Sequence, residues 1–175
     1  MAYTHIVLSQ NSLTSNFETG DCLVVVGNLW VRFLTAESFS HVAIVLVEDE
    51  QVYVVETHEK INDTKKVLYD EWQKSYKKIF LGKPIKSVRD NRQNIQKKIE
   101  EYLAKPPDKK KYGYLTLPKV WLNQIFPGKR FQHRLNVCST FVGEIWRYFG
   151  WSNGGKLADP GDIALSCDAL YKLKG

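Results

Sequence analysis

The stretch Ser40 to Val47, with the sequence SHVAIVLV, decides the fold. After His41 it is apolar at every position, on both alternating faces of an extended chain, and this pattern predicts a central strand that is covered on both sides. Val42 to Val47 is the longest apolar run in the sequence, and it is far shorter than the roughly 20 residues that a membrane span needs. The polar turn Glu48 to Gln51 and the apolar stretch Val52 to Thr57 predict a second strand and hence a β-hairpin.

The rest of the sequence places strands early and helices late. The other predicted strands are Cys22 to Val26 and Lys78 to Leu81. The predicted helices are Asn28 to Leu34, Tyr69 to Tyr76, Asn91 to Ala104, Leu115 to Phe126, Asn136 to Phe149 and a short one that begins at Asp159-Pro160. The basic segment Lys105 to Lys111 is expected to be an exposed loop. Without a repeat or a linker, this order predicts one α+β domain that spans residues 1–175.

Composition is that of an ordinary globular protein. Of the 175 residues, 43% are hydrophobic and 25% are charged, and these proportions exclude disordered, collagen-like and coiled-coil classes. The N-terminal sequence MAYTHIVLSQNS has no basic start followed by an apolar stretch, so no secretory signal is expected. A location in the cytoplasm follows as the expectation.

The charge balance is basic but not concentrated. Lys and Arg number 25 against 19 Asp and Glu, for a net charge of +6, and the lysine pairs are interleaved with acids. This predicts solubility and weak contact with anionic surfaces. Because no recognised binding motif accompanies the charge, no specific nucleic-acid partner is expected.

The chain has three cysteines, Cys22, Cys138 and Cys167. An odd number without a close pair argues against a disulfide framework and against a zinc ribbon. Free thiols fit a reducing compartment. Cys22 and Cys167 have no sequence context that points to chemistry, so both are expected to be structural.

Cys138 differs from the other two cysteines in its position. With Asn136 as the predicted cap, Cys138 falls in the first turn of a helix, where unpaired backbone N–H groups and the helix dipole favour an anion. A thiol placed there can have a lowered pKa, and the thiolate is its reactive form. The alternative is that Cys138 is simply a small buried apolar residue.

The predicted hairpin links His41 to Glu56. If its loop has an even number of residues, His41, Glu56 and His58 lie on one face, with Glu56 opposite or diagonal to His41. A carboxylate there would orient the imidazole. An odd loop would place Thr57 opposite instead. The alternatives are a structural His41, a solvent-facing Glu56, and His58 as the orienting group. A metal site built from His41, His58 and Cys138 would lack close ligand spacing, so neither a metal nor another cofactor is expected.

The order of these parts resembles a known family. The segments that carry the resemblance are Gly20-Asp21 before the strand Cys22 to Val26, then Ser40 to Val45, Val54-Val55-Glu56, Val137 to Val142 and Asp159-Pro160. Over about Thr19 to Leu165 the chain resembles the circularly permuted NlpC-type papain-like cysteine hydrolases, in the YiiX-like branch that also has poxviral and phage members. The resemblance implies a permuted papain-like fold, with an antiparallel sheet packed against helices. For a viral or bacterial member, the location would be a cytoplasm, a host cytoplasm or a virion.

The resemblance implies a role for each candidate residue. Cys138 would be the nucleophile, His41 the general base and acid, and Glu56 the residue that orients His41, while the backbone N–H of Cys138 would help to form an oxyanion hole. The family often has a Tyr-Asp pair before the cysteine helix. Tyr112-Gly113-Tyr114 stands in that place and lacks the acid.

The expected activity is hydrolysis of an amide or ester bond through a thioester, with a small peptide, an amide or an acyl lipid as substrate. One alternative is acyl transfer, with Trp30, Phe33 and Leu34 lining an acyl pocket. Another is a non-catalytic binding protein that retains the fold and uses the basic segment Lys105 to Lys111. The sequence does not indicate an oligomeric state.

Overall fold

The computed structural model describes residues 16–26, 39–58, 62–113, 118–119, 122, 137–153 and 157–174. The strands are β1 Cys22–Val25, β2 His41–Glu48, β3 Gln51–His58, β4 Asp63–Leu68, β5 Ile79–Lys83 and β6 Ala169–Lys174. The helices are α2 Tyr69–Trp72, η4 Gln73–Ser75, α3 Lys86–Arg89, α4 Arg92–Leu103, α5 Pro107–Lys110, α7 Cys138–Arg147 and α8 Pro160–Leu165.

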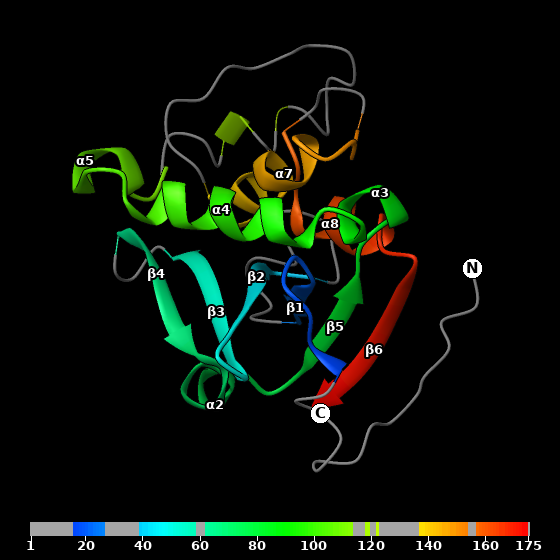
Figure 1. The fold of residues 1–175 in the computed structure, drawn as a ribbon. Coiled ribbons are helices and arrows are strands. Elements are labelled where there is room, and N and C mark those ends of the chain that lie inside the picture. Colours follow the sequence, from blue (N-terminus) through cyan, green and yellow to red (C-terminus); the bar gives the residue numbers. More distant parts are fainter. Residues whose placement is uncertain are drawn as a thin grey trace.

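The strands form one sheet in the order β4-β3-β2-β1-β5-β6, and every neighbouring pair is antiparallel. Helices α4, α7 and α8 lie on one side of this sheet, and the short α2 lies toward the other (Figure 1). The predicted α+β class, with an antiparallel sheet packed against helices, is therefore confirmed.

The stretch that decides the fold forms an inner strand. β2 pairs with β1 on one side and with β3 on the other, and Val42 to Leu46 are fully buried. The two strands β2 and β3 are joined by a two-residue turn, Asp49–Glu50, rather than by the four polar residues of the prediction. Both turn residues have positive φ angles, 47° and 62°, as the tightest hairpin turns require. The turn has an even number of residues, so the predicted sharing of faces holds.

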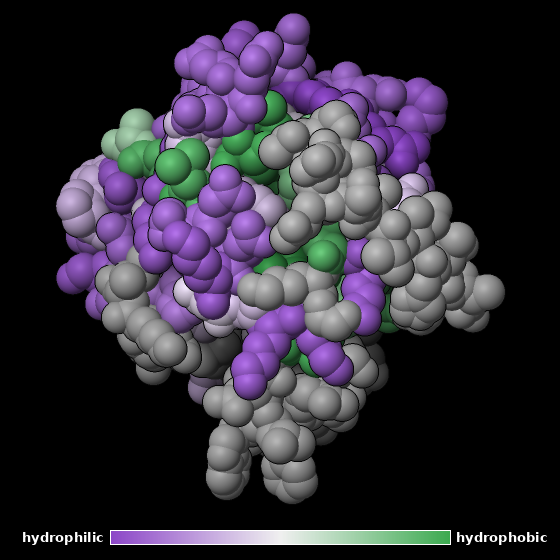
Figure 2. All heavy atoms as spheres, turned by 90° about the horizontal axis from the view of Figure 1, so that it is seen from below, coloured by the Kyte–Doolittle hydropathy of each residue, from purple (hydrophilic) through white to green (hydrophobic). Residues whose placement is uncertain are grey.

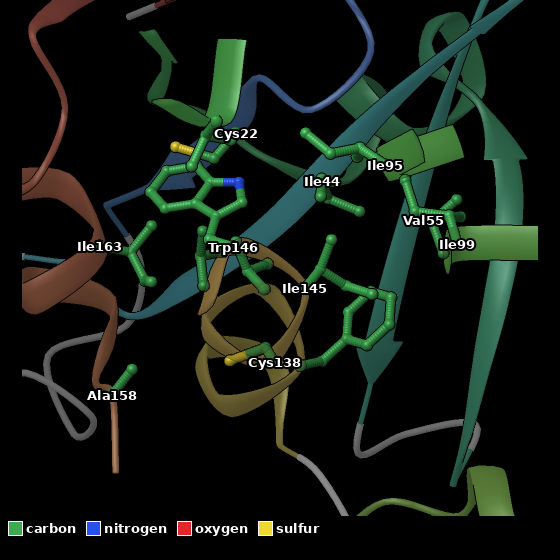
Figure 3. Close-up of a cluster of buried hydrophobic side chains, with 14 of the residues drawn as sticks. Cys22, Ile44, Val55, Ile95, Ile99, Cys138, Ile145, Trp146, Ala158 and Ile163 are labelled. Atoms are coloured by element: carbon green, nitrogen blue, oxygen red, sulfur yellow. The ribbon is translucent and has the colours of Figure 1, made fainter. Parts of the chain in front are cut away.

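The larger core lies between the sheet and helices α4, α7 and α8. Strand residues such as Ile44 meet Ile95 and Ile99 of α4 and Phe141 and Trp146 of α7, all of them fully buried. In Figure 3, Trp146 points from α7 toward Cys22 on β1, with Ile163 of α8 beside it. The sequence repeats an apolar residue every four positions at Val137, Phe141, Ile145 and Phe149, which predicts the buried helix face. Phe141 and Ile145 lie in this core and the partly buried Phe149 packs against it, whereas Val137 belongs to a separate small cluster.

A second core occupies the other face of the sheet. Strand residues Leu23, Val45 and Val54 pack there with Tyr69 and Trp72 of α2. Seen from this side, hydrophobic side chains are visible in patches among hydrophilic ones (Figure 2). Two hydrophobic clusters thus share one sheet, and the strands between them are apolar on both faces.

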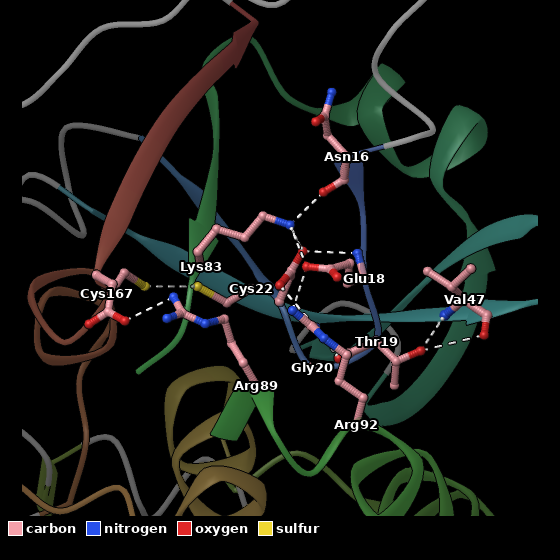
Figure 4. A network of polar contacts seen from close by, with 12 residues as sticks. Asn16, Glu18, Thr19, Gly20, Cys22, Val47, Lys83, Arg89, Arg92 and Cys167 are labelled. Carbon is pink, nitrogen blue, oxygen red and sulfur yellow. Dashed lines mark hydrogen bonds and ion pairs between the residues drawn. The ribbon is translucent and has the colours of Figure 1, made fainter. Parts of the chain in front are cut away.

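A buried ionic cluster fixes the turn before β1. Asp21 is fully buried, and its carboxylate accepts hydrogen bonds from Lys83 of β5 at 2.6 Å, from Arg92 of α4 at 3.3 Å and from the Glu18 backbone N–H at 2.9 Å. Figure 4 shows these side chains converging on the turn. The Trp146 indole N–H also donates to the Gly20 carbonyl at 3.0 Å. The predicted Gly20-Asp21 turn therefore ties the sheet to α4 and α7.

Several predicted boundaries are wrong. Helix α7 begins at Cys138 with Val137 as its cap, instead of Asn136, and it ends at Arg147; Gly150 follows with φ 90°. Residues 107–110 of the expected basic loop are the short helix α5, because Pro107 suits the first helical position. Strands β4 and β6 and helix α3 were not predicted. The predicted helix Asn28 to Leu34 lies outside the described residues.

The last predicted helix is confirmed at its start. The helix predicted at Asp159-Pro160 is α8, where the Asp159 carboxylate accepts from the Asp162 backbone N–H at 2.7 Å. The predicted helix Leu115 to Phe126 lies almost entirely outside the described residues. No helix in the described ranges is both long enough and apolar enough to cross a bilayer.

Candidate functional site

Cys138 is the first residue of α7. The Thr140 hydroxyl accepts a hydrogen bond from the backbone N–H of Val137 at 2.8 Å, which fixes the start of the helix. The prediction that Cys138 lies in the first turn is confirmed, although the capping residue is not the predicted one. Its side chain is buried, and it interacts with the backbone N–H groups of Ser139 and of Val42 on β2.

His41 is the first residue of β2, and its Nε2 lies 2.7 Å from Oε2 of Glu56 on β3. The hairpin register explains this contact. Because Ile44 pairs with Val55, the same offset places Glu56 opposite Ala43, diagonal to His41 and on the same face. This is the geometry that an even loop predicts.

The β2–β3 pairing stops short of the site. The paired register begins at Ile44 and Val55, although β2 extends back to His41 and β3 extends on to His58. His41 and Glu56 therefore lie just beyond the paired part of the hairpin. Cys138 belongs to the larger core and Glu56 contacts Trp72 of the second core, so the site lies between the two cores at this end of the hairpin.

Three donors converge on one oxygen of Glu56. Besides His41, the indole N–H of Trp72 donates to Oε2 at 2.7 Å and the hydroxyl of Tyr76 donates at 3.4 Å. The other oxygen, Oε1, faces Lys65 at 3.8 Å across the β3–β4 pairing. Glu56 is buried, and these donors replace the water that a carboxylate loses on burial.

Two rings flank the imidazole of His41. Tyr76 is stacked on it, with 5.8 Å between ring centroids and an interplanar angle of 15°, and His58 meets it edge-on at 5.3 Å. His58 does not replace Glu56 as the hydrogen-bond partner of Nε2. Glu56 is thus the observed partner of Nε2, and a role for His58 in orienting His41 stays a prediction.

The pKa values of the three groups shift in complementary directions. Burial alone would lower the pKa of His41, but interactions with Cys138 and with Glu56 outweigh it and raise this pKa to about 10. Burial would raise the pKa of Glu56, yet His41 and the Trp72 N–H lower it to about 2. Burial likewise opposes ionisation of Cys138, but His41 and the two nearby backbone N–H groups lower the pKa of its thiol. The three groups therefore favour a thiolate, an imidazolium and a carboxylate.

The structure thus brings Cys138, His41 and Glu56 together, from α7, β2 and β3. Trp72 and Tyr76 are the residues of this site that the sequence analysis missed. They lie four residues apart in a segment predicted only as a short helix, and no pattern in that segment points to Glu56. Trp30, Phe33 and Leu34, proposed above as an acyl pocket, lie outside the described residues.

The other two cysteines lie elsewhere. Cys22 and Cys167 have their sulfur atoms 3.6 Å apart. Burial, together with the neighbouring Cys167 thiol, raises the pKa of Cys22 well above its usual range. Neither contributes to the cluster around His41.

Side chains of the kinds that bind metal ions do not form a cluster among the described residues. Nowhere in these ranges do three or more His, Cys, Asp or Glu side chains gather as metal ligands would. At the candidate site, Nε2 of His41 already engages a carboxylate, and the imidazole also interacts with Cys138.

The protein is an α+β protein with a candidate thiol site. The site consists of a thiol at a helix start and of an imidazole paired with a carboxylate. No protein-family model and no curated protein sequence matches the chain. Among solved structures, its fold is similar to that of the metalloprotein YiiX from Escherichia coli O157:H7, with a TM-score of 0.59. The two chains are 12% identical over 89% of this chain and 96% of that one. This likeness supports the YiiX-like fold, and the papain-like relationship and the viral members stay predictions.

Proposed function

We propose that the protein is a cysteine hydrolase that cleaves an amide or ester bond through a thioester. The observation that carries the proposal is the 2.7 Å hydrogen bond between His41 and Glu56, and the interaction of the same imidazole with the Cys138 thiol supports it. A carboxylate that holds an imidazole, and an imidazole that faces a thiol at a helix start, are the parts of an activated nucleophile. The three side chains come from three separate elements, so they are brought together by the fold and not by being close in the sequence.

The proposal gives each ring nitrogen of His41 one role. Glu56 is ionised, so Nε2 of His41 carries the proton that it donates to the carboxylate. Nδ1 is then the nitrogen that takes the proton of the Cys138 thiol. The thiolate attacks the acyl carbon, forming a carbon–sulfur bond, while the carbonyl electrons move to oxygen.

The second half of the cycle reverses the proton transfer. The Nδ1–H of His41 protonates the leaving amine or alcohol as the tetrahedral intermediate collapses to the thioester. The same nitrogen then removes a proton from water, which attacks the thioester and releases a carboxylic acid and the thiol. First-turn N–H groups of α7, including that of Cys138, are suited to stabilise the oxyanion in both halves.

The proposal is tested by the pH dependence of cysteine alkylation, followed by peptide mass spectrometry in the native protein and in His41→Ala. We expect Cys138 to react with iodoacetamide well below pH 8, and this reactivity to move toward the ordinary thiol pKa of about 8.5 in the variant. Cys22 and Cys167 serve as internal controls. Labelling of Cys138 no faster than these controls would overturn the proposal and favour a binding protein that retains the fold.

Turnover provides the second test. A panel of peptide amides, simple esters and acyl lipids, assayed with and without an added amine acceptor, separates hydrolysis from acyl transfer. Cys138→Ala should abolish release of the acyl group while leaving the thermal unfolding transition in place. Activity that survives this substitution would contradict the assignment of Cys138.

A further inference from the structure

The segment Tyr69 to Tyr76 supplies the aromatic side chains that surround the His41–Glu56 pair. Trp72 is almost completely buried, and its indole N–H donates to Glu56 Oε2 at 2.7 Å. The hydrogen bond between His41 and the same oxygen is equally long. Tyr76 packs against Trp72, with ring centroids 4.6 Å apart, and stacks on the imidazole of His41. One short segment therefore contacts both members of the pair.

These contacts restrict the two rotations that matter for proton transfer. A carboxylate held by a single hydrogen bond can turn about its terminal bond, whereas Glu56 Oε2 is fixed by donors from two elements. Stacking on Tyr76 restricts the tilt of the imidazole. Burial raises the pKa of Tyr76, so its hydroxyl stays protonated and remains a donor toward Glu56.

We propose that Trp72 is a positioning residue of the candidate site: its N–H holds Glu56 in the orientation that keeps His41 directed at Cys138, and Tyr76 assists by stacking. This inference rests on the proposed function, because it assigns a role within the same thiol–imidazole pair. Trp72 itself contacts the carboxylate rather than the reacting sulfur.

The test compares matched substitutions. Trp72→Phe removes the N–H and keeps an aromatic ring, and Tyr76→Phe removes only the more distant hydroxyl. Trp146→Phe is the control, because its indole N–H also donates to a buried oxygen, the Gly20 carbonyl, without touching the site. Thermal unfolding of each variant reports whether it is folded.

We expect Trp72→Phe to move the pH at which Cys138 alkylation begins to higher values, because Glu56 then holds His41 less firmly toward the thiol. The shift should be at most about one unit, the change that corresponds to one lost hydrogen bond to a charged group. Tyr76→Phe should move this pH by less. Trp146→Phe should lower the melting temperature and leave the pH dependence of Cys138 alkylation unchanged. Titration of the His41 ring by NMR should show its pKa falling in the same order.

A second probe guards against loss of folding in Trp72→Phe. Replacement of Trp72 by β-(3-benzothienyl)alanine keeps the fused ring and substitutes sulfur for the N–H group. It should reproduce the pH shift with little change in melting temperature. If the wild-type thiol is activated and neither replacement moves the pH at which Cys138 alkylation begins, the role of Trp72 is wrong and the proposed function stands; if the wild-type thiol is not activated, the proposed function itself fails.

A separate observation concerns Cys22 and Cys167. Their sulfur atoms lie 3.6 Å apart over Gly82, where an added Cβ would come within 2.6 Å of each sulfur. Cys22 is fully buried in β1, whereas Cys167 is partly exposed between α8 and β6. The missing side chain at Gly82 gives both thiols a shared space, and one of them can be reached from solvent.

We infer that Cys22 and Cys167 form a disulfide when a peroxide reaches Cys167. Peroxide oxidises the Cys167 thiol to a sulfenic acid and is itself reduced to water. The Cys22 sulfur then attacks the Cys167 sulfur, an S–S bond forms, and hydroxide leaves with the Cys22 proton as a second water. The sulfur atoms must approach by about 1.5 Å to reach the disulfide length of about 2.05 Å.

The experiment treats Cys138→Ala protein with hydrogen peroxide and maps peptides without reduction. We expect a Cys22–Cys167 cross-link that dithiothreitol removes, together with a higher melting temperature, because the bond closes a long loop. Cys22→Ser should instead accumulate sulfinic acid at Cys167. Sulfinic acid at Cys167 without any cross-link in the parent protein would overturn the inference.

Discussion

Glu56 is a carboxylate that the protein buries at the end of a strand and surrounds with donors. Its lowered pKa is also a statement about stability. A group whose pKa is about 2 in the folded protein and 4.5 in the unfolded chain stabilises the fold above pH 4.5, and this contribution is lost as the pH falls toward 2. His41 behaves in the opposite sense: its pKa, raised from 6.5 to about 10, stabilises the fold below pH 6.5 and loses this effect as the pH rises through 10.

The first prediction concerns Glu56→Gln. The difference in unfolding free energy between wild type and variant should be largest above pH 4.5 and should shrink by about 2 kcal/mol between pH 5 and pH 3. In that range Glu56 takes up a proton in the unfolded wild-type chain but stays ionised in the folded protein, and the glutamine of the variant does neither. Urea unfolding at several pH values measures it. A difference that does not change with pH would mean that the folded protein does not hold Glu56 ionised.

Gly82 gives a second prediction at the scale of single residues. Gly82→Ala should destabilise the protein by about 2 kcal/mol, because the added methyl group would overlap the Cys22 and Cys167 sulfurs. Cys167→Ala makes room, so the double variant should recover part of the loss. A double-mutant cycle measured by urea unfolding tests this coupling, and additive effects would contradict it.

Among the elements, the hairpin and α7 show what the sequence predicts and where it stops. The apolar run predicts the hairpin, and His41 and Glu56 share a face only in the even-loop case, one of the two that the sequence leaves open. Asn136 as the predicted cap places Cys138 in the first turn of a helix. The exact start of the helix was not predicted. The Val137 backbone N–H donates to the Thr140 hydroxyl, and this contact fixes Val137 as the cap. This contact depends on a side-chain rotamer, which periodicity does not contain.

Trp72 and its segment illustrate a second kind of limit. The short helix is predictable from its residues, but its contact with Glu56 joins positions brought together only by the sheet. The edge strands β4 and β6 were missed for a related reason: their sequences are rich in lysine, and only pairing with β3 and β5 makes them strands. Tertiary context decides such segments.

The hairpin turn offers a prediction at the scale of elements. Asp49 and Glu50 both adopt left-handed backbone conformations, which favour Asn and Gly in these turns. Glu50→Gly should therefore stabilise the protein by about 0.5–1 kcal/mol in urea unfolding. Gln51→Gly, one position further in the strand, is the control and should destabilise it. A loss of stability in Glu50→Gly would argue against this turn conformation.

At the scale of the whole molecule, the buried cluster around Asp21 joins the chain before β1 to β5 and α4. Burial raises the pKa of Asp21 although Lys83 and Arg92 oppose this, so the ion pair offsets a desolvation cost rather than adding a large net gain. The cluster matters for stability because removing one partner would leave a buried charge without compensation. The cluster therefore specifies how three separate parts of the chain dock.

Lys83→Met tests this docking. The variant should lose about 3 kcal/mol of unfolding free energy at pH 7, because Asp21 would remain buried with less compensation. The loss should be smaller at pH 4, where protonation of Asp21 removes the uncompensated buried charge. Lys86→Met is the matched control: Lys86 pairs with Asp90 on the surface, and its removal should cost less than about 0.5 kcal/mol. Equal losses in the two variants would contradict the prediction.

The position of the thiol helix late in the chain has a consequence during synthesis. His41 and Glu56 leave the ribosome early, whereas Cys138 follows His41 by about a hundred residues, which at a translation rate of roughly 5–20 residues per second is a delay of about 5–20 seconds. Throughout that interval the hairpin lacks the thiol of α7. Under the proposed function, the nascent chain is therefore unreactive toward acyl groups around the ribosome until α7 has emerged and docked.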